Sequence, residues 1–299
     1  MAITVDQAHI DTFEDTVRQL AQQSTSRAEQ AVTIKNKQSS SHAWDRLAAS
    51  EARQKTSARM VSPAGGNGSG AVGSTDGLEW TRRTTVIKTY DTGEVVEKED
   101  IVQMLIDPKS ASTENLVMNL KRKKDDVIFT AGLADAADGA GGVVSFPTGQ
   151  IVGDYAAEIS LDFVTEVDEK FCTNEVDLDE QKFWFIGPKQ RRKLLQLIEV
   201  TSSDFQGSRA ALATGYLPSF LGFNWVVTNR LNVPDVDQLD NLVMTKKALG
   251  LHVASDIEVS VGERTDMSFA WQVYLMMNID AVRVEDEHIV HAKVADTVT

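Results

Sequence analysis

The sequence predicts an α+β fold, and three observations support this class. Segments typical of strands and helices are interspersed through the second half of the 299-residue chain without a regular strand–helix–strand repeat. Residues 108–135 have the periodicity of one long helix. Hydrophobic residues make up 42% of the chain, which is enough for a globular core and excludes wholesale disorder.

Charge is distributed unevenly along the chain. The 44 Asp and Glu residues exceed the 30 Lys and Arg residues, for a formal net charge of −14 at pH 7. The acids concentrate in residues 153–180, residues 1–60 are nearly neutral, and basic clusters occupy residues 121–124 and 189–193. Because an acidic chain does not hold nucleic acid through charge alone, this balance argues against a general nucleic-acid coat.

The sequence also limits the covalent chemistry and the compartment. Cys172 is the single cysteine, which excludes an internal disulfide and a multi-cysteine metal site. The first residues carry acids and no apolar run, unlike a signal peptide. The longest uncharged stretch, residues 210–229, is interrupted by Gly and Pro, unlike a membrane span. We therefore expect a soluble protein made in a reducing cytoplasm.

Residues 1–60 contain no Gly, no Pro and only two aromatic residues, Phe13 and Trp44. Between residues 10 and 20 a short apolar stripe falls at helical spacing, but the segment lacks the apolar residues for a core of its own. It fits two descriptions equally well: an arm that becomes ordered on another surface, or a flexible tail.

Residues 61–77 are glycine-rich and predict a flexible connector. Their Gly-x-Gly spacing is not a dinucleotide site, because no strand precedes it and no clear helix follows. Residues 80–97 are rich in strand-forming residues and predict a hairpin that turns at Asp91–Gly93. Both faces of that hairpin are polar, and an isolated two-stranded hairpin is marginal in water, so we expect it to lie across a partner.

The next segment carries the clearest helix signal. Asp107 is a favourable N-cap, and Pro108 suits the first helical position. Residues 108–135 would span about 42 Å at ~1.5 Å per residue, the width of a whole domain. The predicted core face consists of Leu116, Leu120, Val127 and Ala131. The predicted solvent side carries Lys121, Arg122, Lys123 and Lys124, which either stay solvated or meet DNA or an acidic neighbour.

The remaining chain predicts short strands and one further helix. The segment 151–167 mixes strand and helix signals, and a helix is expected over residues 188–200. Strands are expected over residues 183–186, 223–228, 257–261, 271–277, 281–284 and 289–294.

No catalytic motif emerges. Nucleophile-elbow, zinc-protease and phosphate-loop patterns are missing from the sequence. His288 and His291 lie three apart on a predicted strand and should point to opposite faces. Asp177, Asp179 and Glu180 lack the spacing of a calcium loop and predict a solvated acidic loop, and Cys172, among acids, predicts an idle thiol. We expect no enzyme, no cofactor and no metal, although a spatial pair of acids for glycoside hydrolysis leaves no sequence signature.

Taken in order, these regions resemble the major capsid proteins of tailed bacteriophages with the Hong Kong 97-type fold. The resemblance covers roughly residues 80–295 and excludes the arm. Each motif is weak alone, but five occur in the family's order. They lie within Glu99–Pro108, Arg122–Ile128, Phe185–Leu195, Gly215–Asn229 and Lys247–Glu258.

The resemblance implies a division of the chain into the parts of that fold. These are an N-terminal arm (1–60), a connector with the E-loop hairpin (61–106), the first part of the P-domain with the spine helix (107–180), the A-domain (181–248) and the return strands of the P-domain (249–299).

It also implies a function and partners. The expected function is self-assembly, as hexamers and pentamers, into the icosahedral virion shell that encloses double-stranded DNA, assembled in the host cytoplasm. Scaffolding, portal and decoration proteins are possible further partners, and a membrane is not. The hairpin residues expected to contact neighbours are Trp80, Arg82, Arg83, Lys88, Tyr90, Glu94 and Glu97.

Two alternatives remain open at this point. The same fold serves in cellular containers, such as encapsulin-like compartments or gene-transfer particles. A soluble hydrolase that uses acidic residues is less favoured, because fold resemblance and missing motifs both argue against it.

Overall fold

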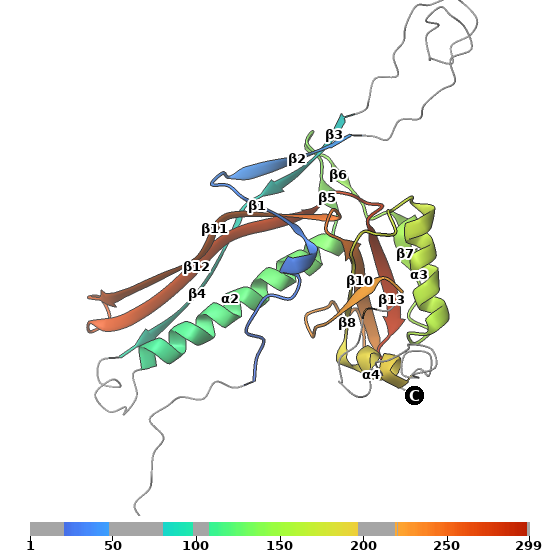
Figure 1. The fold of residues 1–299 in the computed structure, drawn as a ribbon. Coiled ribbons are helices and arrows are strands. Elements are labelled where there is room, and N and C mark those ends of the chain that lie inside the picture. The colour runs from blue at the N-terminus through green and yellow to red at the C-terminus, as the bar shows by residue number, and fades with distance from the viewer. Residues whose placement is uncertain (1–20, 48–79, 98–107, 197–218, 220, 298–299) are drawn as a thin grey trace, which may run out of the picture.

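The computed structural model describes residues 21–47, 80–97, 108–196, 219 and 221–297 (Figure 1). The predicted N-cap Asp107, the glycine-rich connector and the stripe between residues 10 and 20 lie outside these ranges. Among the described residues, no helix combines the length and apolarity needed to cross a membrane.

Two sheets and one long helix organise the chain (Figure 1). The first sheet has the order β1-β11-β12-β4 and forms an extended layer with α2 alongside it. Its elements are β1 Thr33–Asn36, β4 Lys88–Val96, β11 Leu249–Arg264, β12 Ala270–Arg283 and α2 Pro108–Leu133. The second sheet has the order β7-β13-β10-β8-β9 and lies at one end of that layer. Its strands are β7 Ile151–Val152, β8 Lys182–Ile186, β9 Phe223–Val227, β10 Gln238–Thr245 and β13 Ile289–Ala295.

Smaller elements complete the fold. A two-stranded ribbon pairs β2 with β3, and β5 pairs with β6. Their bounds are β2 Ser41–Leu47, β3 Trp80–Val86, β5 Ala136–Ala137 and β6 Val143–Val144, and the remaining helices are α3 Leu161–Thr173, α4 Pro188–Gln196, η2 Glu29–Ala31 and η3 Thr148–Gln150.

Helix α2 is 26 residues long and ends two residues before its predicted end. Leu120 and Val127 are buried, and the core also takes in Ile128 and Phe129, which the predicted pattern omitted. Leu116 and Ala131 are partly buried and pack against the same core. Because the first sheet, the second sheet and residues 28–32 all contribute to this core, α2 buries more of its circumference than a one-sided stripe would.

The predicted hairpin over residues 80–97 is wrong. Asp91, Thr92 and Gly93 lie inside β4, in antiparallel register with β12, and make no turn. Gly93 lies close to its partner strand, since a Cβ there would be 3.0 Å from the Val273 carbonyl oxygen. Pairing with β12 buries Val96 in the sheet, which a free polar hairpin could not do.

The ribbon is instead made by β2 and β3, which pair from Ser41↔Val86 to Leu47↔Trp80. Part of the predicted arm, Ser41–Leu47, is therefore a strand. The two strands are far apart in sequence, so no local turn signal announced their pairing.

The second sheet is covered by α3 on one face. Ser160 caps α3 by accepting a hydrogen bond from the Phe163 N–H at 3.2 Å. Trp184 of β8 is fully buried under the helix, stacked 4.8 Å from Trp225 of β9. Elements β7, α3 and β13, which the predicted boundaries place in the P-domain, belong with this second sheet.

Several other predictions can be compared directly with the structure. The strands expected over 183–186, 223–228 and 289–294 are present within one residue at each end. The segments 271–277 and 281–284 are one strand, β12, and 257–261 is part of β11. Strand β10 was not predicted, because Asp240 and Asn241 interrupt its apolar pattern, although both side chains are buried.

Asp240 joins three elements at the centre of the second sheet. Its carboxylate accepts hydrogen bonds from Tyr155 at 2.5 Å, from Asn232 at 2.6 Å and from His291, whose Nε2 lies 2.8 Å away. Burial alone would raise the pKa of Asp240, but the hydrogen bonds from His291, Tyr155 and Asn232 outweigh it and lower the pKa.

Asp240→Asn is expected to lower the free energy of unfolding at pH 7 by about 2–4 kcal/mol, because an amide presents its own N–H to groups that donate. Since the folded pKa of Asp240 lies below the unfolded value, its contribution is present above the unfolded pKa and is lost as the pH falls through the folded pKa. Denaturant unfolding should show a smaller difference in the free energy of unfolding between variant and wild type at pH 3 than at pH 7.

Asp45→Asn is the matched control. Asp45 pairs with Arg82 at 2.6 Å in an exposed ion pair, so the change should stay below about 1 kcal/mol. Equal losses in the two variants would contradict the role of Asp240.

Candidate assembly surfaces

The β2–β3 ribbon projects from the body of the molecule (Figure 1). At its outer end Leu47 and Trp80 are cross-strand partners and are 48% and 70% exposed. Val86, at the inner end, is 61% exposed. Large exposed apolar side chains at the outer end of the described ribbon mark a surface that gains free energy when another molecule covers it.

The predicted contact residues of the ribbon divide into two groups. Trp80 and Arg82 are exposed, and Arg82 pairs with Asp45 across the ribbon. Arg83 is 5% exposed, and its Nη2 lies 2.9 Å from Asp286 of the same chain. The expectation that Arg83 faces a neighbour is therefore corrected: it points inward and attaches the ribbon to its own subunit.

The predicted contact residues on β4 and directly after it also divide into exposed and half-buried side chains. Lys88, Glu94 and Glu97 are exposed, and Lys88 lies 3.5 Å from Asp280. Tyr90 is half-buried, packs on the core and lies under the Lys123 ammonium at 5.2 Å from the ring centroid. Burial raises the pKa of Tyr90. Tyr90 thus serves the subunit interior, and the three exposed charges lie on its surface.

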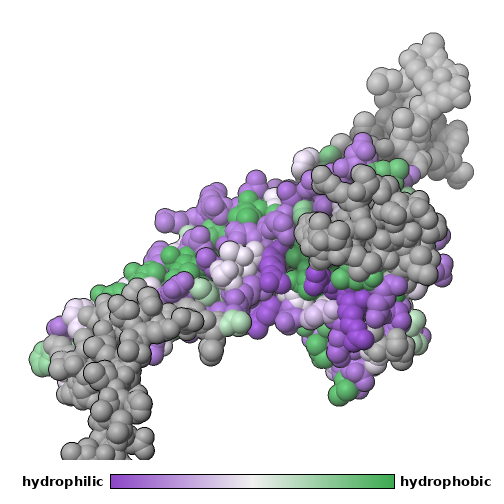
Figure 2. Space-filling model, turned by 60° about the horizontal axis from the view of Figure 1, so that its bottom comes forward, coloured by the Kyte–Doolittle hydropathy of each residue, from purple (hydrophilic) through white to green (hydrophobic). Residues whose placement is uncertain are grey.

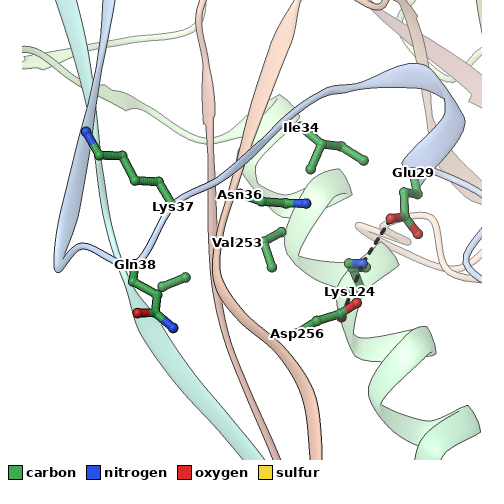
Figure 3. Close-up of a pocket in the computed structure, with 9 residues that line it drawn as sticks. Glu29, Ile34, Asn36, Lys37, Gln38, Lys124, Val253 and Asp256 are labelled. Carbon is green, nitrogen blue, oxygen red and sulfur yellow. Dashed lines mark hydrogen bonds and ion pairs between the residues drawn. The ribbon is translucent and has the colours of Figure 1, made fainter.

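The basic cluster of α2 is not a solvated face. Only Lys123 is exposed, and Lys121 and Arg122 are half-buried. Arg122 donates a hydrogen bond to Gln22 at 2.7 Å. Lys124 is 8% exposed, with its ammonium 3.0 Å from Glu29 and 3.8 Å from Asp256. Figure 3 shows this ion pair at a cleft between α2, β11 and the segment before β1.

The side chain next to Lys124 is the anchor of that segment, and the sequence reading missed it. Asp125 is fully buried, and its carboxylate accepts hydrogen bonds from the Ser26 hydroxyl at 2.5 Å and the Gln23 amide at 2.5 Å. The backbone N–H groups of Arg27 and Ala28 also donate to it, at 3.0 and 3.1 Å. One carboxylate thereby satisfies a whole turn of the incoming chain, as an N-cap does for a helix.

The same turn also reaches the second sheet. Arg27 donates to the Val227 carbonyl oxygen at the end of β9. On α2, Asp126 accepts a hydrogen bond from Arg230 Nε at 2.8 Å. The segment from Gln22 to Glu29, the long helix and the loop after β9 are therefore held together by charged groups.

A second junction lies directly after the C-terminal end of α2. Arg283 is fully buried, and its guanidinium donates to the carbonyl oxygens of Ala134 at 2.6 Å and Val144 at 2.9 Å. Asp286 accepts from Arg283 at 2.5 Å and from Arg83 at 2.9 Å. The β2 strand is attached alongside, through Arg46 and Glu285 at 2.9 Å.

The groups considered for chemistry are dispersed. Within the described ranges, no three His, Cys, Asp or Glu residues gather as a metal site would require. His291 binds Asp240, whereas His288 lies 3.0 Å from Thr245 and 3.7 Å from Glu180. Glu180 also pairs with Lys247 at 3.2 Å. The exposed thiol of Cys172 lies near the end of α3.

Solved capsid structures share this arrangement. The capsid of the cyanophage P-SCSP1u aligns with a TM-score of 0.73 at 15% identity, covering 99% of this chain and 96% of that one. The capsid of the cyanophage Pam1 aligns with a TM-score of 0.72 at 10% identity, covering 98% of both chains. The capsid of a native GTA particle aligns with a TM-score of 0.66 at 9% identity, covering 97% and 96%. A search of curated protein sequences found no match.

The fold is therefore that of tailed-phage shell proteins, the Hong Kong 97-type fold, with its ribbon, spine helix and two sheets. The sequence itself matches the phage capsid protein family over residues 5–296. The chain belongs to that family.

Asp125→Asn is expected to release the turn at residues 26–28 and to lower the free energy of unfolding by about 2–4 kcal/mol, because an amide cannot accept all of these donors. Limited trypsin digestion of the unassembled subunit should then cleave after Arg27 several-fold faster than in the wild type.

The neighbouring variant Asp126→Asn is the control, because Asp126 is half-buried and pairs with Arg230 instead. It should leave cleavage after Arg27 near the wild-type rate. If both variants accelerate cleavage equally, Asp125 is not the specific anchor.

Proposed function

We propose that this phage capsid protein is the major shell subunit of a tailed phage, which assembles as hexamers and pentamers into an icosahedral shell around double-stranded DNA. The family match over residues 5–296 carries the proposal. In this assignment β2–β3 with its connection is the E-loop, α2 is the spine helix, the sheet of β11 and β12 is the P-domain, and the sheet of β8 and β10 is the A-domain.

The surface supports assembly through many small contacts. Figure 2 shows apolar side chains in separate patches among polar ones, on the face turned to the viewer. Contacts of this kind between unlike surfaces close into rings when the rotation between copies is fixed, as a shell requires. The rigid junctions at Asp125 and Arg283 would fix that rotation, while the ribbon reaches across to the neighbour.

The acidity of the subunit fits this role. A net charge of −14 keeps unassembled subunits apart in solution. A closed shell retains DNA by enclosing it, so the inner wall does not need to grip phosphates. We propose no catalytic role, and we propose assembly in the host cytoplasm, with scaffolding, portal or decoration proteins as further partners.

The second candidate is the shell of a gene-transfer particle, which the likeness to the capsid of a native GTA particle favours. Electron cryo-microscopy of particles purified from producing cells tests both. Uniform shells filled with genome-length phage DNA support the first, and shells with short host fragments support the second. A protein that stays monomeric or dimeric under all assembly conditions would contradict both.

Trp80→Glu is expected to reduce shell formation strongly while leaving the melting temperature of the unassembled subunit unchanged, because a side chain that is 70% exposed contributes little to its own fold. Negative-stain particle counts and thermal unfolding measure the two effects. Leu178→Glu is the matched control: Leu178 is 72% exposed and lies in the segment between α3 and β8, outside the ribbon. Normal shells from the Trp80 variant would refute the contact role of the ribbon end.

A further inference from the structure

At the inner end of the ribbon, aromatic rings pack against β11. The Trp44 ring covers Gly250, where a Cβ would lie 2.5 Å from the indole. His42, two residues before Trp44, meets that ring edge-on at 4.8 Å between centroids. The His252 ring, which extends from β11, lies 5.3 Å from His42. Two imidazoles, one on the ribbon and one on β11, are therefore neighbours where the ribbon joins the sheet.

The buried ring of this pair, His252, is held through its Nε2 atom. His252 is fully buried, and its Nε2 lies 2.9 Å from the Lys37 carbonyl oxygen. Because a carbonyl oxygen only accepts, Nε2 carries the proton. Nδ1 is buried and has no hydrogen-bond partner among the described residues.

The charged groups around the two histidines either bind other groups or are cations that oppose a positive charge on His42. Asp280 lies opposite His252 in the β11–β12 register, but its oxygens face the Val86 N–H at 3.2 Å and Lys88 at 3.5 Å. The charged groups that act on His42 are the cations Lys35 and Lys37 and the carboxylate Asp45, while Asp280 and its partner Lys88 lie across the sheet from His252.

These surroundings lower the pKa of His42 below its ordinary value. Burial is the largest cause, followed by His252, Lys37 and Lys35, and Asp45 opposes them. The unfolded chain therefore binds the proton at a higher pH than the fold does. The stability that His42 contributes is complete above an ordinary pKa of 6.5 and declines as the pH falls below it.

We propose that His42, packed between the Trp44 and His252 rings, is a proton-operated hinge for the β2–β3 ribbon. At neutral pH the packed rings hold the ribbon base on β11. In mildly acidic solution, protonation of His42 places a cation against these rings, close to Lys35 and Lys37, and loosens the base. Where the ribbon contacts a neighbour, which rests on the proposed function, the hinge makes the angle of that contact depend on pH.

Hydrogen exchange on the unassembled full chain at pH 7.5 and pH 5.5, corrected for intrinsic exchange rates, tests the hinge. The protection of β2 and β3 should fall several-fold at pH 5.5, relative to the fully buried strand β8. Unchanged protection of the ribbon, or an equal loss in β8, would overturn the proposal.

His42→Gln, which cannot gain the proton, should abolish this pH response. His288→Gln, which alters a histidine away from the ribbon, should retain it. An NMR titration of the wild-type His42 ring gives an independent check: a midpoint below 6.5 supports the hinge, and a midpoint at or above it overturns it.

Light scattering of the same samples separates the hinge from the proposed function. If the ribbon responds to pH but no shells form under any condition, the hinge stands and the shell function fails. If shells form while ribbon exchange is independent of pH, the shell function stands and the hinge fails.

Discussion

The buried guanidinium of Arg283 holds the end of α2, the β5–β6 turn and the ribbon at one point. It donates to main-chain carbonyl oxygens at the end of α2 and in β6, and it shares Asp286 with Arg83 of the ribbon. Burying such a charge is costly, and the cost is offset only because its donors are engaged at hydrogen-bond distance. Loss of Asp286 would leave the buried guanidinium groups of Arg283 and Arg83 without their shared carboxylate, so the relative orientation of the outward-reaching parts depends on this cluster.

Asp125 is likewise a buried charged group, and its hydrogen bonds hold the arm segment before β1. Polar contacts stabilise less per area than apolar burial, but they are directional, so they fix the path of a chain segment rather than only its attachment. The segment from Gln22 to Glu29 has few apolar side chains, and it is ordered by polar contacts. These contacts are with Arg122, Lys124 and Asp125 of α2 and with the Val227 carbonyl oxygen at the end of β9. An arm with no core of its own is held in a defined direction in this way.

For a shell subunit, this arrangement separates two tasks. The two sheets and α2 form a frame built around two buried apolar clusters. The ribbon exposes Leu47 and Trp80 at its outer end, the apolar area that we propose contacts another molecule. The histidine pair lies between the frame and the base of the ribbon. Protonation there alters the angle between the ribbon and the frame while the frame remains folded.

The sequence by itself determined the elements whose signals are local: the long helix, the buried strand Lys182–Ile186, the strands near residues 225 and 290, and the family, through short motifs in a fixed order. Tertiary structure alone decided which strand Lys88–Val96 pairs with, that Ser41–Leu47 closes the ribbon, and that Arg83, Lys124 and Asp125 point inward. The physical reason is that periodicity shows which face of an element is apolar, whereas strand pairing and the burial of charged side chains depend on partners up to about two hundred residues away in the chain.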